Sequence, residues 1–596
     1  MEASENSLVL GLVGYNHYKV AQCYSTGLVS GENYVGGLVG CNDSSKVSCC
    51  YSRAAVIGEY MVGGLVGSNW GGNVTHSYSS GTVSGVGLVG GLVGENLGSI
   101  TTSYNTSEVI GTKNVGGLVG VGSWTVLYSV WNMETSGLLG SAGGVGLTTN
   151  EMMEPNMLGL NGFANDPNWV LDAGRDYPRL AWEGTRGQII PEPKIDWLEG
   201  HGTTENPYRI DTGDQLILLS KSSILWDKHF VLGADIDLDP ALPNGHIFRQ
   251  APIQVFTGVF DGKGHTISHL AITGQNYLGL FGQLDSAAKV KDLGIVDVNI
   301  SGSGYYVGGL VGQMVHSCLV THCYCTGIMS GIGDVGGLVG RNVTDHYADI
   351  RPSEGGSITN CYSIAETKGN GSVGGLVGSN YGALIHCSST GTVGGTGDCI
   401  GGLVGQHFSK IFIQCYSTAS VTGNEDVGGL VGWNETGNIT TSYSSGAVKG
   451  NANVGGLVGQ NRSIWYGDWA GSVSDCYNTG SVTGGSCVGG LVGQNWTGLI
   501  TTSYSTGVVN GESEVGGLVG CGIPPFVASS FWDIQTSGQG TSAGGTGKTT
   551  AEMQTARTFL DAGWDFVDET ANGTEDIWWM PENDYPRLWW EPIISN

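Results

Sequence analysis

Charged residues, basic residues above all, and long hydrophobic segments are scarce in this 596-residue chain, and each shortage excludes a class of protein. Only 13% of the residues are charged, and 52 acidic against 24 basic side chains give a net charge of −28. This charge repels nucleic acids and anionic lipid surfaces, so neither is an expected partner. No apolar run approaches the roughly 18 residues of a membrane-spanning helix, so membrane insertion is not expected either.

Several signatures of chemistry are missing as well. None of the 12 histidines is followed by glutamate, which excludes the H-E-x-x-H helix of metallopeptidases. The 14 cysteines contain no C-x-x-C pair, which argues against a zinc site. The first residues, Met1–Asn6, lack the basic segment that begins a secretion signal. We expect a protein without enzymatic activity and without a cofactor, calcium being the one ion that its acidic residues could bind.

What the chain does have is a recurring phrase, V-G-G-L-V-G. Copies begin at Val35, Val62, Val89, Val115, Val307, Val335, Val373, Ile400, Val427, Val454, Val488 and Val515. Most neighbouring copies lie about 27 residues apart, a period that is typical of stacked repeat units. Between copies the apolar residues come in short groups separated by glycine, which favours strands and tight turns over helices. The sequence therefore predicts an all-β fold built of right-handed parallel β-helix (solenoid) modules, with three short strands in each coil.

The copies fall into two arrays, and each array is followed by a similar tail. The tails share G-x-T-T-x-E-M and D-Y-P-R-L-x-W-E, the latter at Asp176–Glu183 and Asp584–Glu591. Thr148-x-x-Glu151, Thr549-x-x-Glu552 and Thr212-x-x-Gln215 fit capping boxes of short helices. We read the tails as lids on the last coil of each array. The predicted parts are a first array at 1–120 without a cap before it, its C-terminal cap at 121–185, a linker at 186–197, an N-terminal cap at 198–255, a second array at 256–520 and its C-terminal cap at 521–596.

Stacking places equivalent residues above one another, and the C-Y-S segment then forms two ladders. The first contains Cys23, Cys50, Cys323, Cys361, Cys387, Cys415 and Cys476, with Ser77, Ser103, Ser442 and Ser503 in other coils. Exchange of cysteine with serine indicates a small buried position; a few disulfides involving Cys318, Cys323 or Cys325 are the alternative. Strand alternation then turns the adjacent tyrosines outward. An exposed row of rings could bind sugars or a partner, or could only stabilise the sheet.

Candidate binding residues follow from these ladders and from insertions. Trp465, Tyr466 and Trp469 lie in an inserted segment, and insertions in repeat proteins emerge as loops. Tyr362, Tyr416 and Tyr443 represent the outward tyrosine ladder. Both groups are candidates for recognising a glycan or a surface protein; the alternative for both is packing against the solenoid itself.

Two further hypotheses concern ions and assembly. Asp235, Asp237 and Asp239 alternate along one strand and could gather calcium, although a solvated strand face explains them equally. Residues around Leu8, Leu10, Leu12 and Val13 read like half a repeat, which predicts an edge where another chain could dock. Such docking would join copies head to tail as a homo-oligomer or filament.

The phrase V-G-G-L-V-G, with C-Y-S-T-G and G-x-V-x-G between its copies, resembles the GLUG-repeat family. G-T-T-E-N-P-Y-R-I and Phe256–Leu270 also look like the segment that leads into such arrays. The resemblance implies an extracellular or cell-surface β-helix of bacteria or archaea, used in display or adhesion, and carries no catalytic residues. The expected function is therefore a structural or adhesive repeat protein; the alternative is a β-helix that binds or cleaves carbohydrate.

Overall fold

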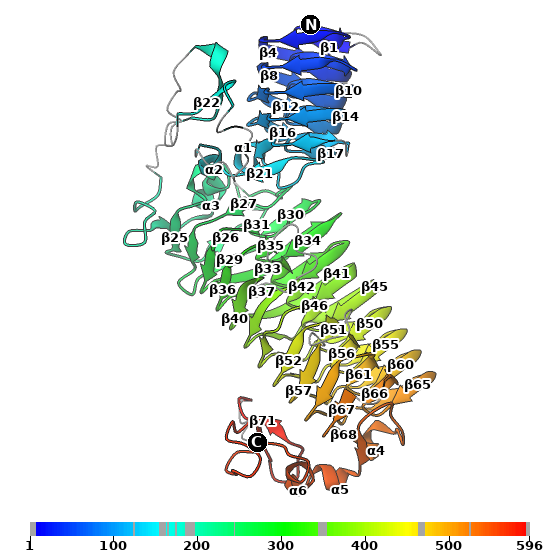
Figure 1. Cartoon of the computed structure of the whole chain (residues 1–596). Helices are drawn as coiled ribbons and strands as arrows, with labels where there is room; N and C mark the ends of the chain where they lie inside the picture. Colours follow the sequence, from blue (N-terminus) through cyan, green and yellow to red (C-terminus); the bar gives the residue numbers. More distant parts are fainter. Residues whose placement is uncertain are drawn as a thin grey trace. The chain divides into compact units, whose positions relative to one another are not determined.

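The computed structural model describes residues 8–122, 125–153, 163, 166–172, 176–184, 197–243, 245–343, 355–462, 471–523 and 526–591 (Figure 1). The chain separates into two compact units. One comprises residues 1–195 with 222–224, and the other comprises 196–221 with 225–596. Each unit is a stack of β-coils in Figure 1. The predicted loop residues Trp465, Tyr466 and Trp469 and almost all of the 186–197 linker lie outside the described residues.

One coil of the larger unit shows how the repeat folds. It runs through β50 (Glu425–Gly428), β51 (Val431–Glu435), β52 (Asn438–Thr440), β53 (Tyr443–Ser444) and β54 (Val448–Lys449). Each strand pairs in parallel with the strand one repeat later, so that Val427 lies beside Val454 and Val431 beside Val458. The predicted all-β class and parallel stacking of coils are confirmed.

Equivalent strands from successive coils form continuous sheets. The strands that follow the G-G-L turn in the larger unit form a ten-stranded sheet of β27 (Ile253–Phe256), β31 (Phe281–Leu284), β35 (Val311–Met314), β39 (Val339–Asn342), β42 (Val377–Asn380), β46 (Val404–His407), β51, β56 (Val458–Arg462), β61 (Val492–Asn495) and β66 (Val519–Gly522). In the smaller unit the strands that precede the turn form a sheet of β1 (Leu8–Leu10), β5 (Asn33–Gly36), β9 (Tyr60–Gly63), β13 (Gly87–Gly90) and β17 (Lys113–Gly116). The coils thus share their register along each stack.

The V-G-G-L-V-G phrase supplies the core and the turn of each coil. Val427, Leu430 and Val431 are fully buried, and their equivalents in neighbouring coils stack on them. The first glycine of the phrase has no room for a side chain: a Cβ on Gly428 would lie 1.9 Å from the carbonyl oxygen of Val431. Glycine is therefore required by the close approach of two backbones.

Two hydrogen-bonded ladders run through the interior. Asn42 donates to Asn69 and Asn69 to Asn96, each over 2.8 Å between the amide nitrogen and oxygen. In the cysteine ladder, the backbone N–H of Cys387 donates to the Cys415 sulfur, and the N–H of Cys415 donates to the Ser442 hydroxyl. A thiol or a hydroxyl can fill this acceptor role, which explains the exchange of cysteine with serine. The prediction of a small buried position is confirmed, whereas the asparagine ladder was not predicted.

Short helices occur mainly in the capping segments. They are α1 (Met133–Ser136), α2 (Thr149–Met153), α3 (Gly213–Leu219), α4 (Ile534–Ser537), α5 (Thr550–Met553) and α6 (Ala556–Leu560). The three predicted capping boxes are present at Thr148, Thr212 and Thr549. In the described residues, none of the helices has the length and apolar character needed to span a membrane.

The N-terminal segment of the larger unit continues the stack. Strand β24 (Tyr208–Ile210) pairs in parallel with β25 (His229–Leu232), which pairs with β28 (Val259–Asp261). Helix α3 lies between β24 and β25 in sequence. These elements therefore occupy coil positions ahead of the first V-G-G-L-V-G turn.

The tails do more than cover the last coil, and the expected lid is corrected in this respect. The segments at β23 (Arg179–Leu180) and β71 (Arg587–Leu588) lie along the outside of the tyrosine ladders. Tyr104 donates to the Pro178 carbonyl in the smaller unit, and Tyr504 donates to the Pro586 carbonyl in the larger one. The shared D-Y-P-R-L-x-W-E segment is thus a docking element for outward tyrosines.

Candidate functional site

The tyrosine ladders are only partly open to solvent. Tyr24 and Tyr362 are 56% and 41% exposed, whereas Tyr477 and Tyr504 are fully buried beneath the tail. The rings stack regularly, with centroids 4.9 Å apart between Tyr324 and Tyr362. The expected exposed row was wrong for the coils nearest each tail, because the tail supplies aromatic and carboxylate partners there.

Two of the named candidate tyrosines lie beside the tail. Trp590 packs with its ring centroid 6.2 Å from Tyr416 and 5.8 Å from Tyr443, and both tyrosines are half-buried. Tyr362 lies beyond the tail, so ligand binding by Tyr362 stays a prediction. The assembly edge also stays a prediction: Leu12 is 48% exposed, and β1 and β2 (Val13–Asn16) are terminal strands of their sheets.

A second outward surface follows the V-G-G-L-V-G turns, and we call it the turn groove. It is formed by the residue before each phrase and the residue after it, such as Asp334 and Arg341 around the copy at Val335. The residue before the phrase has a positive φ, as in Asp334 at 50° and Asp426 at 53°. The core phrase hardly changes between coils, whereas these two flanking positions vary widely. The turn groove is therefore a place where coils differ in chemistry.

Contacts in the turn groove run diagonally between coils. The residue before one phrase meets the residue after the next phrase. Ser379 donates to Asp334 in this way, and Arg341 donates to the Tyr306 hydroxyl over 3.3 Å. The same diagonal explains why two cysteines at different positions of the repeat can come together.

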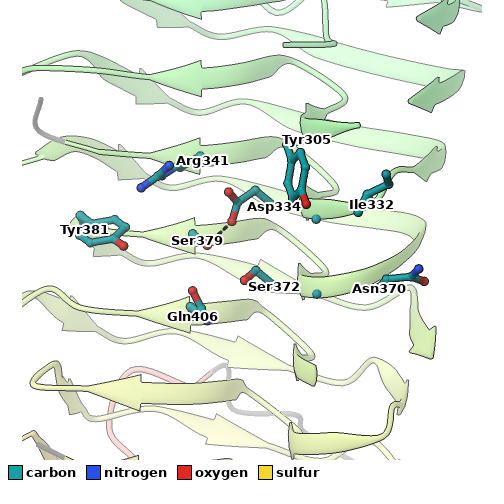
Figure 2. Close-up of a pocket in the computed structure, with 11 residues that line it drawn as sticks. Tyr305, Ile332, Asp334, Arg341, Asn370, Ser372, Ser379, Tyr381 and Gln406 are labelled. Atoms are coloured by element: carbon teal, nitrogen blue, oxygen red, sulfur yellow. Dashed lines mark hydrogen bonds between the residues drawn. The ribbon is translucent and has the colours of Figure 1, made fainter. Parts of the chain in front are cut away.

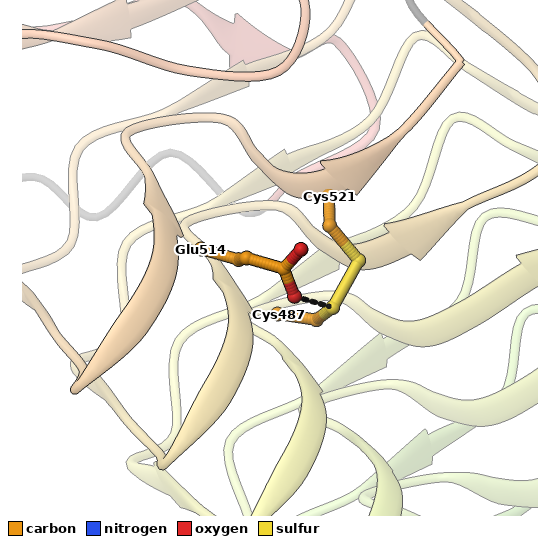
Figure 3. Close-up of side chains that lie close together, drawn as sticks. All are labelled: Cys487, Glu514 and Cys521. Carbon is orange, nitrogen blue, oxygen red and sulfur yellow. Dashed lines mark hydrogen bonds between the residues drawn. A yellow bond between two sulfur atoms is a disulfide. The ribbon is translucent and has the colours of Figure 1, made fainter.

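Cys487 and Cys521 form a disulfide across this diagonal, with their Cα atoms 5.0 Å apart (Figure 3). The two cysteines lie in different register columns of the repeat, so the cysteine ladder of the sequence did not predict this pair. The suggested alternatives Cys318, Cys323 and Cys325 are free and buried. Glu514 lies beside Cys487, with 3.0 Å between its carboxylate oxygen and the sulfur. Within the described residues, these three side chains are the one group of His, Cys, Asp and Glu close enough to hold a metal ion, but the two sulfurs are bonded to each other.

Breaking this bridge should destabilise the last coils of the larger unit. The bond closes a 34-residue separation, and the Cys487→Ser/Cys521→Ser double variant should lose about 2–4 kcal/mol of unfolding free energy. Denaturant unfolding followed by circular dichroism measures the loss. A Cys476→Ser variant, which keeps the bridge, is the control; equal midpoints for the wild type and the double variant would contradict the prediction.

The turn groove also holds a carboxylate that titrates near neutrality. Burial raises the pKa of Asp426 to about 6, with Glu425 and Asp398 adding to the rise and a hydrogen bond from Asn453 opposing it. Between pH 4 and 6 the unfolded chain would release this proton while the folded chain keeps it. Stability is therefore lost as pH rises through this window.

Asp426→Asn should remove that loss. We expect the variant to gain about 2 kcal/mol at pH 7.5 and to match the wild type at pH 4. Asparagine suits the left-handed backbone at this position, as Asn453 does in the next coil. Denaturation at both pH values provides the measurement, with Glu512→Gln as a surface control. An equal gain at pH 4 would show that the effect does not come from ionisation.

A hollow of about 290 Å³ opens beside the turn groove of the larger unit (Figure 2). Its lining includes Tyr305, Ile332, Asp334, Arg341, Asn370, Gly371, Ser372, Ser379, Tyr381 and Gln406. These residues come from successive coils, so none of them is close in sequence to all the others. The hollow combines a half-exposed tyrosine, a carboxylate, a guanidinium group and side-chain amides. No motif in the sequence marked it.

Two of the suggested calcium residues, Asp235 and Asp237, face histidines of the next coil. Asp235 lies 3.1 Å from His265 Nδ1, and Asp237 lies 2.8 Å from His269 Nδ1. The Asp237 hydrogen bond raises the pKa of His269. The Asp237 carboxylate also accepts the N–H of Asp239. Calcium binding at this strand stays a prediction.

Gly540–Gly544 reads G-T-S-A-G, the spacing of a hydrolase nucleophile turn. Here the Ser542 hydroxyl accepts the N–H groups of Leu518 and Val519 and donates to the Val519 carbonyl. Ser141 makes the equivalent contacts with Leu118 and Val119 in the smaller unit. The serine therefore closes the last coil and is not presented as a nucleophile.

Comparison with known families identifies the repeats. The family described as the GLUG motif matches residues 58–84, 369–394, 423–449, 450–483 and 484–510, which lie in both units. The chain contains GLUG-motif repeats. Each matched segment contains one complete copy of the V-G-G-L-V-G phrase, so the family's repeat corresponds to one structural coil.

Two curated proteins resemble parts of this GLUG-repeat chain. Halomucin of Haloquadratum walsbyi is 34% identical over 154 residues, which are 24% of this chain and 2% of halomucin. A protein of Evansella cellulosilytica, provisionally described as a Gly-rich membrane protein, is 35% identical over 122 residues, 19% of this chain and 14% of its own length. The chain thus aligns with only a small part of either relative.

A solved structure from Bacteroides ovatus, of a protein proposed to be an immunoglobulin A1 protease, aligns with 66% of this chain and 95% of its own. The sequence identity is 20% and the TM-score 0.26. A TM-score of this size does not indicate a shared arrangement of coils.

Proposed function

We propose that the chain is an extracellular, surface-associated repeat protein that serves display or attachment and has no catalytic activity of its own. The observation that carries the proposal is the contrast between a constant core and variable outward columns. Val427, Val454 and Val488 repeat one buried environment in successive coils, while the turn-groove residues beside them change. A stack of this kind holds different side chains at fixed spacings on a stiff support.

The net charge and one relative are in keeping with an extracellular, surface-associated protein. A net charge of −28 keeps a long sheet surface soluble and disfavours adhesion to anionic polymers. One relative is described as a membrane protein. The proposed partners are glycans or surface proteins, and the edge around Leu8–Val13 is the proposed contact for self-association.

Attachment can be measured with the full chain coupled to beads. The beads are passed over surfaces coated with neutral polysaccharide, acidic polysaccharide or protein, and beads with heat-denatured chain serve as the control. Retention on at least one surface by the folded chain alone is expected. Equal retention of both bead types on all surfaces would contradict the attachment role, and release of sugars from any polysaccharide would contradict the absence of catalysis.

A further inference from the structure

The hollow arises from two consecutive glycines in an outward column. Two residues before each V-G-G-L-V-G copy, the larger unit has Tyr305, Gly333, Gly371, Asp398 and Glu425 in successive coils. Other coils carry a side chain there, such as Ser513 in the last one. At about 4.8 Å per coil, the gap from Tyr305 to Asp398 spans about 14 Å. The glycines therefore leave a floor without side chains between an aromatic residue and an acid.

The space over the Gly371 part of this floor is open. A Cβ on Gly371 would meet no atom within 4 Å, and Gly371 has an ordinary backbone conformation. Tyr305 is 50% exposed and stands at one end, where its ring lies over Gly333. Tyr305 and Asp334 both line the hollow shown in Figure 2. An aromatic face with free space beside it is the usual platform for an apolar ring face.

One wall of the hollow offers both hydrogen-bond acceptors and donors. Ser379 donates to the Asp334 carboxylate, and burial raises the pKa of Asp334 while Arg341 opposes the rise. Arg341 lies over the rings of Tyr306 and Tyr381, with its guanidinium carbon 5.6 Å and 5.5 Å from their centroids. Gln406 lines the hollow from the following coils. The charged groups are thus held in place by neighbouring side chains.

The opposite wall is partly apolar. Ile332 is 41% exposed, and Asn370 beside it accepts a hydrogen bond from Thr396. Few ligand classes match an aromatic end, an aliphatic side and a row of mixed donors and acceptors. A sugar ring does, since it presents C–H groups on its faces and several hydroxyls around its edge.

We propose that this hollow binds one or two sugar residues of a neutral glycan chain. A volume of about 290 Å³ lies at the lower end of small-ligand sites and suits a short segment of chain. Vicinal hydroxyls can donate to Asp334, and Arg341 and Gln406 can donate to sugar oxygens. This proposal rests on the attachment function above and names its ligand class.

Acidic sugars fit less well. The Arg341 charge is balanced by Asp334, and Asp398 and Glu425 follow in the same column as the floor. A uronate or sialate carboxylate would meet this excess of negative charge. The hollow should therefore prefer neutral chains, which separates it from a general polyanion site.

The test uses calorimetric titration of the full chain with cellohexaose, mannohexaose and a galactohexaose, and with hexagalacturonate as the acidic probe. Binding of at least one neutral probe is expected. Gly371→Tyr should weaken it at least 10-fold by filling the hollow. Ser513→Tyr introduces the same side chain in the same column outside the hollow, and should leave affinity unchanged. Circular dichroism confirms that both variants are folded.

Two more variants locate the contacts. Asp334→Asn should weaken neutral-probe binding several-fold, and Tyr362→Ala, on the separate tyrosine ladder, should not change it. The inference is overturned if no neutral probe binds, if Gly371→Tyr binds as tightly as the wild type, or if hexagalacturonate binds more tightly than every neutral probe.

The outcomes separate this inference from the proposed function. If beads carrying Gly371→Tyr attach as well as wild-type beads do, attachment does not depend on the hollow. The attachment role would then stand, and the hollow would have no part in it. Loss of oligosaccharide binding in Gly371→Tyr, combined with wild-type beads that attach to no surface, would support the glycan site and contradict attachment.

Discussion

Gly428→Ala should lower the unfolding free energy of the larger unit by about 3 kcal/mol or more. The added Cβ would lie 1.9 Å from the Val431 carbonyl oxygen and 2.7 Å from the Gly459 nitrogen. Both atoms belong to the backbone, so no side-chain rotation can make room. The turn must open, which separates Val427 and Val431 from their partners in adjacent coils.

Gly394→Ala is the matched control for this prediction. A Cβ there would meet only the Thr422 oxygen at 3.9 Å, and Gly394 has no positive φ. Alanine at such a position reduces the freedom of the unfolded chain and should stabilise by about 0.4–1 kcal/mol. Guanidinium unfolding of both variants measures the difference. If both variants changed the unfolding free energy in the same direction, the turn at Gly428 would not be too tight for a side chain.

Trp564→Ala should cost about 3–5 kcal/mol and release the C-terminal cap of the larger unit. Trp564 is fully buried, with its ring centroid 4.7 Å from Phe559 and 4.6 Å from Trp578. Its indole N–H donates to the Ser529 carbonyl over 2.8 Å. Truncation removes this packing and leaves a partly buried carbonyl without its donor.

Hydrogen exchange identifies the part of the chain that loses structure in Trp564→Ala. Amides of residues 526–591 should exchange faster, while those of β50 to β56 keep their protection. Trp589→Ala, at a site that is 53% exposed, should change stability by less than about 0.5 kcal/mol. Unchanged exchange in the cap would mean that the tail is held by other contacts.

Much of the scaffold could be predicted from the sequence, because equivalent residues have the same local environment in every coil. The spacing of V-G-G-L-V-G indicated stacking, and the exchange of Cys415 for Ser442 indicated a small interior position. The capping boxes at Thr212 and Thr549 depend only on residues three apart. Local patterns of this kind do not depend on which distant segments meet.

The tails and the bridge could not be predicted, because their contacts join different parts of the repeat. The Tyr477 hydroxyl donates to the Glu591 carboxylate, 114 residues away in the sequence. The segment D-Y-P-R-L-W-W-E contains no pattern that predicts contact with a tyrosine ladder. Cys487 and Cys521 occupy different columns of the repeat and meet only through the diagonal geometry of the turn groove. Comparing one column at a time could not reveal either contact.

The candidate site was missed for a different reason. Aromatic residues such as Trp465 and Tyr416 are conspicuous in the sequence, whereas the hollow depends on the absence of side chains at Gly333 and Gly371. In a chain with 105 glycines these two are inconspicuous. Only the register, which places both in one column between Tyr305 and Asp398, distinguishes them from turn glycines.

The central claim is that a constant core holds variable outward columns and that the glycine gap in one column is the binding site. A crystal structure of the full chain with the tightest neutral hexaose tests this most directly. The account predicts a sugar ring beside Tyr305, over Gly371, with hydroxyls on Asp334. A sugar seated on Tyr324 and Tyr362, with the hollow left empty, would contradict it.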